Sequence, residues 1–138
     1  MADSSDVDNA LIALLGADAT LLALCPNGVY YDEAPPNSTR FVIVSLADQH
    51  DEPMFRARAF EDGLYLVKAV MLSTSGGDIK SAAARIDALL DQQTMTVSGY
   101  SVTTMRRDSR VRITEVDDED KSIRWFHRGG RYQVVAST

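Results

Sequence analysis

The sequence is poor in the residues on which disulfides, thiolate metal sites and export depend. Its 138 residues include one cysteine and two histidines, so an internal disulfide and a thiolate metal cluster are both excluded. The first residues are acidic, whereas a secretory signal needs positive charge there. No apolar run approaches the roughly 20 residues that span a bilayer. We therefore expect a soluble protein that folds in the cytosol.

The sequence also has few residues and motifs that are typical of catalytic sites. The sequence has no G-x-S-x-G turn, and His50 and His127 are its only imidazoles. Both histidines are predicted to be surface or interface residues, and Cys25 is predicted to pack as a small apolar side chain at a helix end. Residues 75–78 contain two glycines but lack the G-K-[ST] of a phosphate-binding loop, so they predict a helix start. We expect no enzyme activity, no cofactor and no metal.

The amino-acid composition is that of an ordinary globular domain. Apolar residues make up 45% and charged residues 25% of the chain, with no internal repeat, low-complexity tract or linker. A chain of this length removes roughly two-thirds of its unfolded surface from water as one domain. We therefore predict a single domain over residues 1–138.

The net charge of −6 is unevenly distributed. Residues 1–62 carry 11 acidic and 3 basic residues, whereas residues 106–138 carry 6 acidic and 8 basic residues. An acidic chain gains little from neutralising phosphates, so tight nucleic-acid binding is not expected. DNA is expected to pass such a protein without specific binding.

Helix signals are clear in three places. Apolar residues at three-to-four-residue spacing predict an amphipathic helix that Asp6 or Asp8 caps and that Gly16 ends. Asp18 is placed to cap a second short helical turn. Residues 78–90 carry apolar side chains on one helical face and charged side chains off it, which predicts a second amphipathic helix.

The rest of the chain predicts strands. Residues 48–53 are acidic and are expected to leave the sheet as a loop or hairpin tip. Gly129 and Gly130 predict a bulge or bend. The fold class is α+β, a mostly antiparallel sheet with an N-terminal helix and one amphipathic helix packed on it. The predicted strands are residues 40–47, 55–72, 95–105, 110–116 and 122–135.

Two features predict contacts between subunits. Residues 64–72 are apolar on both faces, which a helix on one side and a neighbouring subunit on the other would cover. The only basic cluster has no interleaved aromatic residues for stacking on bases. Pairing with the acidic first half of another subunit explains it best, with solvated charge as the alternative. The cluster consists of Arg106, Arg107, Arg110 and Arg112.

Three segments in one order resemble the tail-terminator (tail-completion) proteins of long-tailed bacteriophages of the siphovirus type. They are residues 8–24 (DNALIALLGADATLLAL), 29–35 (VYYDEAP) and 41–45 (FVIVS). The resemblance implies a structural virion protein that forms a hexameric ring on the head-proximal end of the tail tube. Such a ring ends tube polymerisation and offers the surface that joins tail to head, as part of the head–tail connector.

The resemblance also implies partners and a location. The partners would be other copies of the chain, the tail tube protein and a head-completion or adaptor protein, and assembly would take place in the host cytoplasm. No cofactor is implied. Two alternatives stay open: a head-closure or adaptor protein of the same connector, and a small non-viral intracellular binding module or enzyme subunit.

Two further surfaces are predicted within this reading. Apolar anchors beside charged residues mark a segment as a contact with the tube or a head partner; it comprises Asp48, Asp51, Glu52, Met54, Phe55, Arg56, Arg58 and Phe60. The acidic run after residue 115 lacks calcium-loop spacing and predicts a solvated hairpin tip. As a weaker possibility, Asp117, Asp118 and Asp120 line the lumen of the ring.

Overall fold

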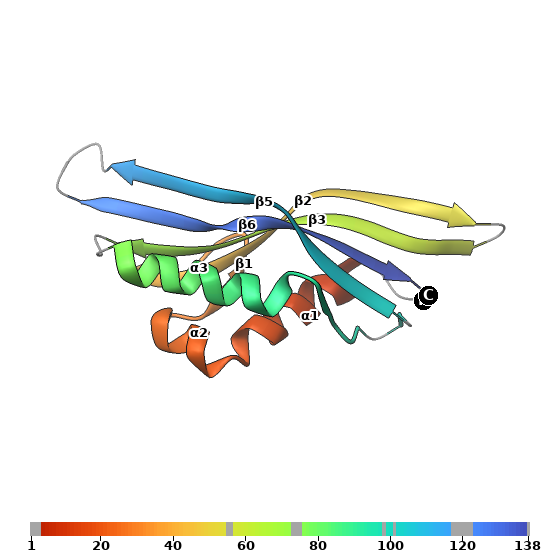
Figure 1. Ribbon diagram of the computed structural model, residues 1–138, viewed down its shortest axis with the longest axis horizontal. Helices are drawn as coiled ribbons and strands as arrows, with labels where there is room; N and C mark the ends of the chain where they lie inside the picture. Colours follow the sequence, from red (N-terminus) through yellow and green to blue (C-terminus); the bar gives the residue numbers. More distant parts are fainter. Residues whose placement is uncertain are drawn as a thin grey trace.

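The computed structural model describes residues 4–54, 57–72, 76–97, 99–100, 102–116 and 123–137. Within them, one mixed sheet has the strand order β1-β2-β3-β6-β5-β4, and three helices lie on one side of it (Figure 1). The helices are α1 (Ser4–Gly16), α2 (Ala19–Leu24) and α3 (Gly76–Leu90). The strands are β1 (Val29–Tyr31), β2 (Arg40–Met54), β3 (Ala57–Leu72), β4 (Gln93–Thr94), β5 (Val102–Val116) and β6 (Arg124–Ser137).

The helix predictions are largely confirmed. Helix α1 ends at Gly16, and the side chain of Asp18 caps α2 by accepting a hydrogen bond of 2.9 Å from the backbone N–H of Leu21. The prediction that Asp6 or Asp8 caps α1 is wrong, because the helix already begins at Ser4 and both residues lie within it. Asp8 instead accepts a hydrogen bond from the hydroxyl of the buried Tyr65, which ties α1 to β3.

Strand β2 is longer than the sequence predicts. It continues through the acidic stretch to Met54, and Ala47 is an extra residue at which the pairing with β3 shifts. The prediction that residues 48–53 leave the sheet is therefore wrong. Pairing with β3 satisfies the backbone there, and this end of the β2–β3 hairpin extends past the helices as an arm (Figure 1), so no apolar layer excludes charged residues. We call the paired residues 48–54 and 57–62 the arm.

The second half of the sheet also differs from expectation. Residues 102–116 form one continuous strand, β5, with a bulge at Asp108, where two strands are predicted. Gly129 and Gly130 lie in an unbroken part of β6 instead of a bulge. A Cβ at Gly129 would lie 2.0 Å from the carbonyl oxygen of Val67, so glycine is required there by the close approach of β3. The sheet is mixed because β1, which the sequence does not predict, pairs in parallel with β2.

The core lies between the helices and one face of the sheet. Strand alternation turns Tyr65, Val67, Ala69 and Met71 of β3 toward the helices, and all four are buried. The opposite face of the sheet is less covered: Val70 is buried, whereas Leu64, Leu66 and Leu72 of the same face are half-buried. A subunit that covers this face stays a prediction. Helix residues of the core include Leu11, Leu15, Leu21, Ile79, Ala82, Ile86 and Leu90.

In the described part of the chain, no helix is long and apolar enough to cross a membrane.

Candidate interaction groove

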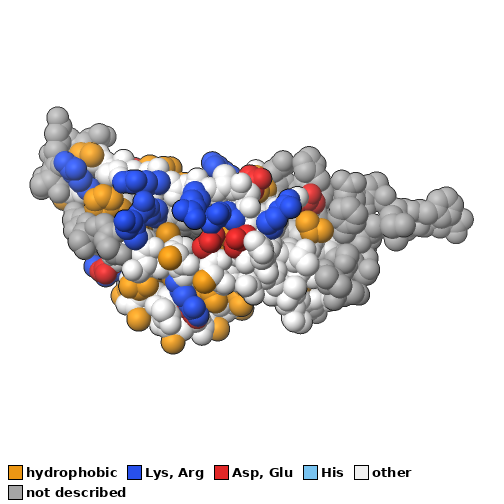
Figure 2. All heavy atoms as spheres, in the orientation of Figure 1, with side chains coloured by type: hydrophobic (Ala, Val, Ile, Leu, Met, Phe, Trp, Pro, Cys, Tyr) orange, Lys and Arg blue, Asp and Glu red, His pale blue; other side chains and the backbone are white. Residues whose placement is uncertain are grey.

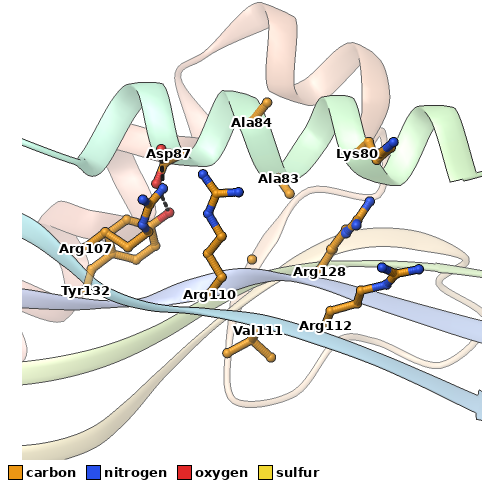
Figure 3. A pocket seen from close by; sticks show the side chains of 11 residues that line it. Lys80, Ala83, Ala84, Asp87, Arg107, Arg110, Val111, Arg112, Arg128 and Tyr132 are labelled. Carbon is orange, nitrogen blue, oxygen red and sulfur yellow. Dashed lines mark hydrogen bonds and ion pairs between the residues drawn. The ribbon is translucent and has the colours of Figure 1, made fainter.

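A bulge on β5 decides which arginines share a face. The pairing with β6 skips Asp108, so Arg107 and Ser109 oppose successive residues of β6. Neighbouring residues of a regular strand point to opposite faces, and residues 107 and 110 would therefore point apart. The extra residue restores the phase and places Arg107 on the same face as Arg110 and Arg112, toward α3 (Figure 3).

Arg106 does not belong to this group. It lies on the opposite face of β5, where its Nη2 donates a hydrogen bond of 2.9 Å to Oε1 of Gln133 on β6. The sequence cluster of four arginines is thus divided by strand alternation into one residue on the open face and three residues beside α3.

Arg107 is engaged within the domain. Its Nη1 lies 2.9 Å from Oδ2 of Asp87, and its backbone N–H donates a bond of 2.9 Å to Oδ1 of Asp91. The other oxygen of Asp87 accepts a bond of 2.9 Å from the hydroxyl of Tyr132 (Figure 3). Burial first, and the adjacent Asp87 second, raise the pKa of Tyr132, so its hydroxyl stays protonated and donates. This network fastens α3 to β5 and β6.

Two more ion pairs use charges of α3. Asp78 Oδ2 lies 3.0 Å from Arg40 Nη1 of β2. Arg85 forms a two-pronged contact with Asp18, at 2.6 Å and 2.8 Å. The hydrogen bonds from Arg85 lower the pKa of Asp18 to about 2. The first pair joins α3 to β2 and the second joins α3 to the start of α2. Lys80 of α3 lines the groove described next.

A groove of about 530 Å³ opens between α3 and strands β5 and β6. Five cations line it: Arg107, which is paired with Asp87, and four others, which are Lys80 from α3, Arg110 and Arg112 from β5, and Arg128 from β6. Within the described residues, none of these four has a carboxylate within ion-pairing distance. Their side chains converge on the space beside α3 (Figure 3), and Lys and Arg side chains form a band across this face of the molecule (Figure 2).

The groove is suited to an anion with several oxygens. Guanidinium groups present planar pairs of donors that match carboxylates and phosphates. The small side chains of Ala83 and Ala84 line the helix side and keep the space open. Lys80, Arg110, Arg112 and Arg128, from three elements, therefore form a binding surface for an anion. None of these four residues is a nucleophile paired with a general base.

The sequence reasoning missed two members of the groove. Lys80 lies in the helix predicted at residues 78–90 and Arg128 lies 16 residues after Arg112, so the sequence does not group either residue with the arginine cluster. A signal exists in retrospect: Lys80, Ala83, Ala84 and Asp87 follow helical spacing on one face. That spacing does not reveal that β6 contributes to the groove, because Arg128 joins the groove through cross-strand pairing with Arg112.

The other predicted contact residues are only partly described. Asp48, Asp51, Glu52 and Met54 lie in β2, and Arg58 and Phe60 lie in β3, with Asp51 opposite Glu61 and Glu52 opposite Phe60 in the arm. Phe55 and Arg56 lie outside the described residues, as do Asp117, Asp118 and Asp120.

Cys25 and His127 are both buried. Cys25 is fully buried at the C-terminal end of α2, as predicted, and burial raises the pKa of its thiol to about 11. His127 is buried within the chain, so a surface position is wrong, and the alternative of an interface position stays a prediction. Its Nε2 lies 3.2 Å from Oε1 of Glu115, while burial first and Lys68 second lower its pKa. The described residues contain no group of three or more His, Cys, Asp or Glu arranged for a metal.

Comparison with known proteins gives a likeness in fold. No family model and no curated protein sequence matches the chain. A solved component of the virion of a native gene transfer agent particle has 18% identity and a TM-score of 0.62, over 96% of this chain and 95% of its own length. A second solved protein, known only by a reference number, has 14% identity and a TM-score of 0.60, over 100% of this chain and 97% of its own. The chain therefore shares its fold, end to end, with a component of a virion.

Proposed function

We propose that this chain is a structural virion protein of the tail-terminator type. It assembles as a hexameric ring on the head-proximal end of a phage tail tube, ends polymerisation of the tube and supplies the surface that joins tail to head. It acts without a cofactor and without catalysis, and DNA passes through it.

The observation that carries the proposal is the end-to-end likeness to the gene transfer agent component. The match covers 96% of this chain and 95% of the other at a TM-score of 0.62, so it involves the whole domain instead of a common substructure. A virion role agrees with the three segments that resemble tail terminators, at residues 8–24, 29–35 and 41–45.

The groove supports assembly of several copies. One small chain closes into a ring when two different surfaces of each copy meet head to tail. The cationic groove, with Arg110, Arg112, Arg128 and Lys80, is one such surface. It requires an acidic surface in return, and a chain with net charge −6 carries an excess of acidic residues.

The arm supports a second kind of contact. The described residues near its end include Met54, Arg58 and Phe60, and contact cores likewise combine apolar and cationic residues. The arm reaches beyond the helices (Figure 1), where it is available to the tail tube or to a head-completion partner.

Electron microscopy of the protein with isolated tail tubes tests the proposal. The expected result is a ring-shaped density on one end of each tube and tubes of constant length when assembly takes place in its presence. Binding to portal complexes and not to tubes would favour the head-closure or adaptor alternative. A protein that binds neither particle and caps no tube would refute a virion role.

A further inference from the structure

We infer that the free outer edge of β5 pairs, backbone to backbone, with the free outer edge of β2 of a second copy. The inference rests on the proposed ring, and it names the two strand edges that meet at each subunit contact. The occupant is an extended strand whose N–H and C=O groups continue the sheet from one copy into the next.

Each end of the sheet has one covered outer edge and one free outer edge. In the described residues, β1 pairs with β2 only as far as Val44, and β4 pairs with β5 only at Thr104 and Met105. The uncovered part of each strand belongs to a hairpin, and the β2–β3 and β5–β6 hairpins project from opposite ends of the sheet (Figure 1). The two free edges therefore lie at diagonally opposite corners, and a free edge is a template for pairing with another chain.

The pairing of β5 determines which of its residues present hydrogen-bonding groups at the free edge. The N–H of Arg107 points outward, since it donates to Oδ1 of Asp91 at 2.9 Å. After the one-residue bulge, strand alternation gives the outward position to Arg110, Arg112 and Thr114. Asp91 thus occupies the edge at Arg107, whereas in the described part of the chain no strand or loop bonds to the backbone of the next three outward residues.

The same stretch of β5 carries two exposed apolar side chains. Ile113 is 47% exposed on the face of the sheet away from the helices, and Val116 is 48% exposed on the other face. A further strand beside β5 would cover both side chains from the side. The free edge therefore offers apolar contact as well as hydrogen bonds.

Strand β2 presents its backbone in the same alternating way. The carbonyl of Val44 points outward, where it accepts a hydrogen bond of 2.9 Å from the N–H of Asp32. Beyond the extra residue Ala47, alternation makes Gln49 an outward position. The free edge of β2 therefore also has backbone donors and acceptors that point away from its own sheet.

The two free edges match in length and direction. The free stretch is residues 45–54 on β2 and residues 106–116 on β5, which is ten residues against eleven. Three antiparallel pairings separate β2 from β5, so the two strands run antiparallel. Copies arranged head to tail keep the same orientation, and β5 of one copy then meets β2 of the next as an antiparallel pair. Alignment over the full length places residue 54 opposite Arg107 and residue 48 opposite Ile113.

Residue composition favours the pairing of unlike edges over the pairing of like edges. Residues 48–52 include three acidic residues, whereas residues 106–112 include four arginines. Two β5 edges would bring arginines opposite arginines, which destabilises a strand pair. Head-to-tail pairing gives each copy two neighbours, and closure into a ring leaves no free edge. The offset between the two hairpins is then taken up by a tilt of the strands, as in a barrel.

Proline at an outward position of the full-length protein tests the contact. Thr114→Pro removes an outward N–H from β5 without removing a bond to β6, and Gln49→Pro does the same at the edge of β2. Each variant should associate roughly tenfold or more weakly than the wild type in sedimentation velocity, because the missing N–H leaves a carbonyl of the neighbour unpaired. The matched controls Thr114→Ala and Gln49→Ala keep the N–H and should associate as the wild type does.

A mixture of the two proline variants shows which edges meet. Thr114→Pro keeps the edge of β2 and Gln49→Pro keeps the edge of β5, so an equimolar mixture should form a dimer of the two variants and nothing larger. Neither variant alone should dimerise. Dimers of Gln49→Pro alone would show that β5 pairs with β5, and dimers of Thr114→Pro alone would show that β2 pairs with β2. Either result would overturn the inference.

Hydrogen exchange measures the same contact at single amides of the wild type. The outward amides of Arg110, Arg112 and Thr114 should exchange fast in the dissociated protein and slowly in the assembly. The amides of Val111 and Ile113 point toward β6 and should exchange slowly in both states. Equal exchange of the outward amides in the two states would overturn the inference.

Cross-linking tests the alignment of the two strands. Ile113→Cys with Asp48→Cys puts thiols at opposed positions of neighbouring copies, and the native Cys25 is fully buried. This double variant should give a ladder of disulfide-linked oligomers under mild oxidation, whereas each single variant should stop at the dimer. The control Ile113→Cys with Gln49→Cys shifts one thiol to the next residue, which alternation turns to the other face of the sheet, and should give no ladder. A first double variant without a ladder would overturn the contact in this alignment.

The proposed ring and the strand pairing fail in different ways. Capping of tail tubes by both proline variants as well as by the wild type would overturn the pairing and leave the ring intact. Self-association of the wild type that the proline variants lose, without capping of any tube, would support the pairing and refute the role at the tail. A wild type that neither self-associates nor caps tubes would overturn both.

Discussion

Asp87 of α3 binds two residues of the sheet at once: its Oδ1 accepts a hydrogen bond from the hydroxyl of Tyr132 and its Oδ2 pairs with Arg107, both at 2.9 Å. This shared carboxylate separates the arginines of β5 by role. Arg107 is fixed within the domain. Arg110, the next residue on the same face of β5, is directed into the groove (Figure 3).

Removal of this carboxylate should destabilise the domain. Asp87→Ala leaves the buried Tyr132 hydroxyl without its partner and Arg107 without its counter-ion, and we expect a loss of about 2 kcal/mol in the free energy of unfolding. Tyr132→Phe in the Asp87→Ala background should cost little more, because the unpaired hydroxyl is then absent. Urea denaturation of the four proteins of this double-mutant cycle measures the coupling. Additive losses would mean that the two groups do not interact.

Asp18 should make stability depend on acidic pH. Its pKa is about 2 in the folded protein against the ordinary 3.8, so the unfolded chain binds the proton more readily. The stabilisation is complete above pH 4 and is lost as the pH falls through 3.8 toward 2. Asp18→Asn keeps a capping side chain but loses the charged pair with Arg85, and we expect a cost of about 1 kcal/mol at neutral pH.

The difference between wild type and Asp18→Asn should narrow as the pH falls from about 5 toward 2, where Asp18 of the folded protein is half protonated. Thermal unfolding from pH 2 to pH 7 follows this difference. The matched control is Asp32→Asn, since Asp32 is exposed. A constant difference between wild type and Asp18→Asn at all pH values would attribute the effect to the cap alone.

His127 should make the stability of the fold depend on pH a second time, at higher pH than Asp18 does. Burial and Lys68 lower its pKa in the folded protein below the ordinary 6.5, and Glu115 opposes them. Because the unfolded chain takes up the proton first, stability falls as the pH drops below about 6.5. His127→Gln should remove this part of the slope, and Glu115→Gln should increase it by withdrawing the charge that favours the imidazolium.

Measurement of the histidine titration by NMR gives the folded-state pKa directly. The prediction fails if the imidazole of His127 titrates at or above the value of a histidine in the unfolded chain.

The close approach of β3 and β6 makes Gly129 irreplaceable. A Cβ there would lie 2.0 Å from the carbonyl oxygen of Val67 and 2.5 Å from the Cα of Lys68. Both neighbours are backbone atoms, so relief requires strands to separate, and Gly129→Ala should cost about 3 kcal/mol. Gly16→Ala is the control, since a Cβ at Gly16 meets nothing within 4 Å. Equal stability of the two variants in urea would show that the strands adjust freely.

The sequence predicted elements whose signals are local. The caps at Asp18 and the end of α1 at Gly16, and the face of α3 that carries Ile79, Ala82 and Ile86, follow from residues within one or two turns. Cys25 was also placed correctly, because a helix end and apolar neighbours are visible in the sequence.

Features that depend on pairing between distant segments were missed. The acidic residues 48–53 predict a loop because charge is unfavourable in a covered sheet, yet this part of the sheet extends beyond the helices. The bulge at Asp108 has no signal in the sequence, and it decides that Arg107, and not Arg106, lies on the side of Arg110. The groove itself joins residues 80, 110, 112 and 128, which only the fold brings together.

The last prediction concerns DNA. A protein through which DNA moves should not hold it, and a chain with net charge −6 gains little from releasing counter-ions. We expect no gel shift of duplex DNA at micromolar protein and low salt, where electrostatic binding is strongest. The groove variant Arg110→Glu with Arg112→Glu should behave as the wild type does in this assay. Sub-micromolar affinity that disappears in the groove variant would instead make the cationic groove a DNA-binding site. Loss of ring formation on neutralising Asp117, Asp118 and Asp120 would place these acids at the subunit contact, instead of the solvated hairpin tip that the sequence predicts or the weaker alternative of the lumen.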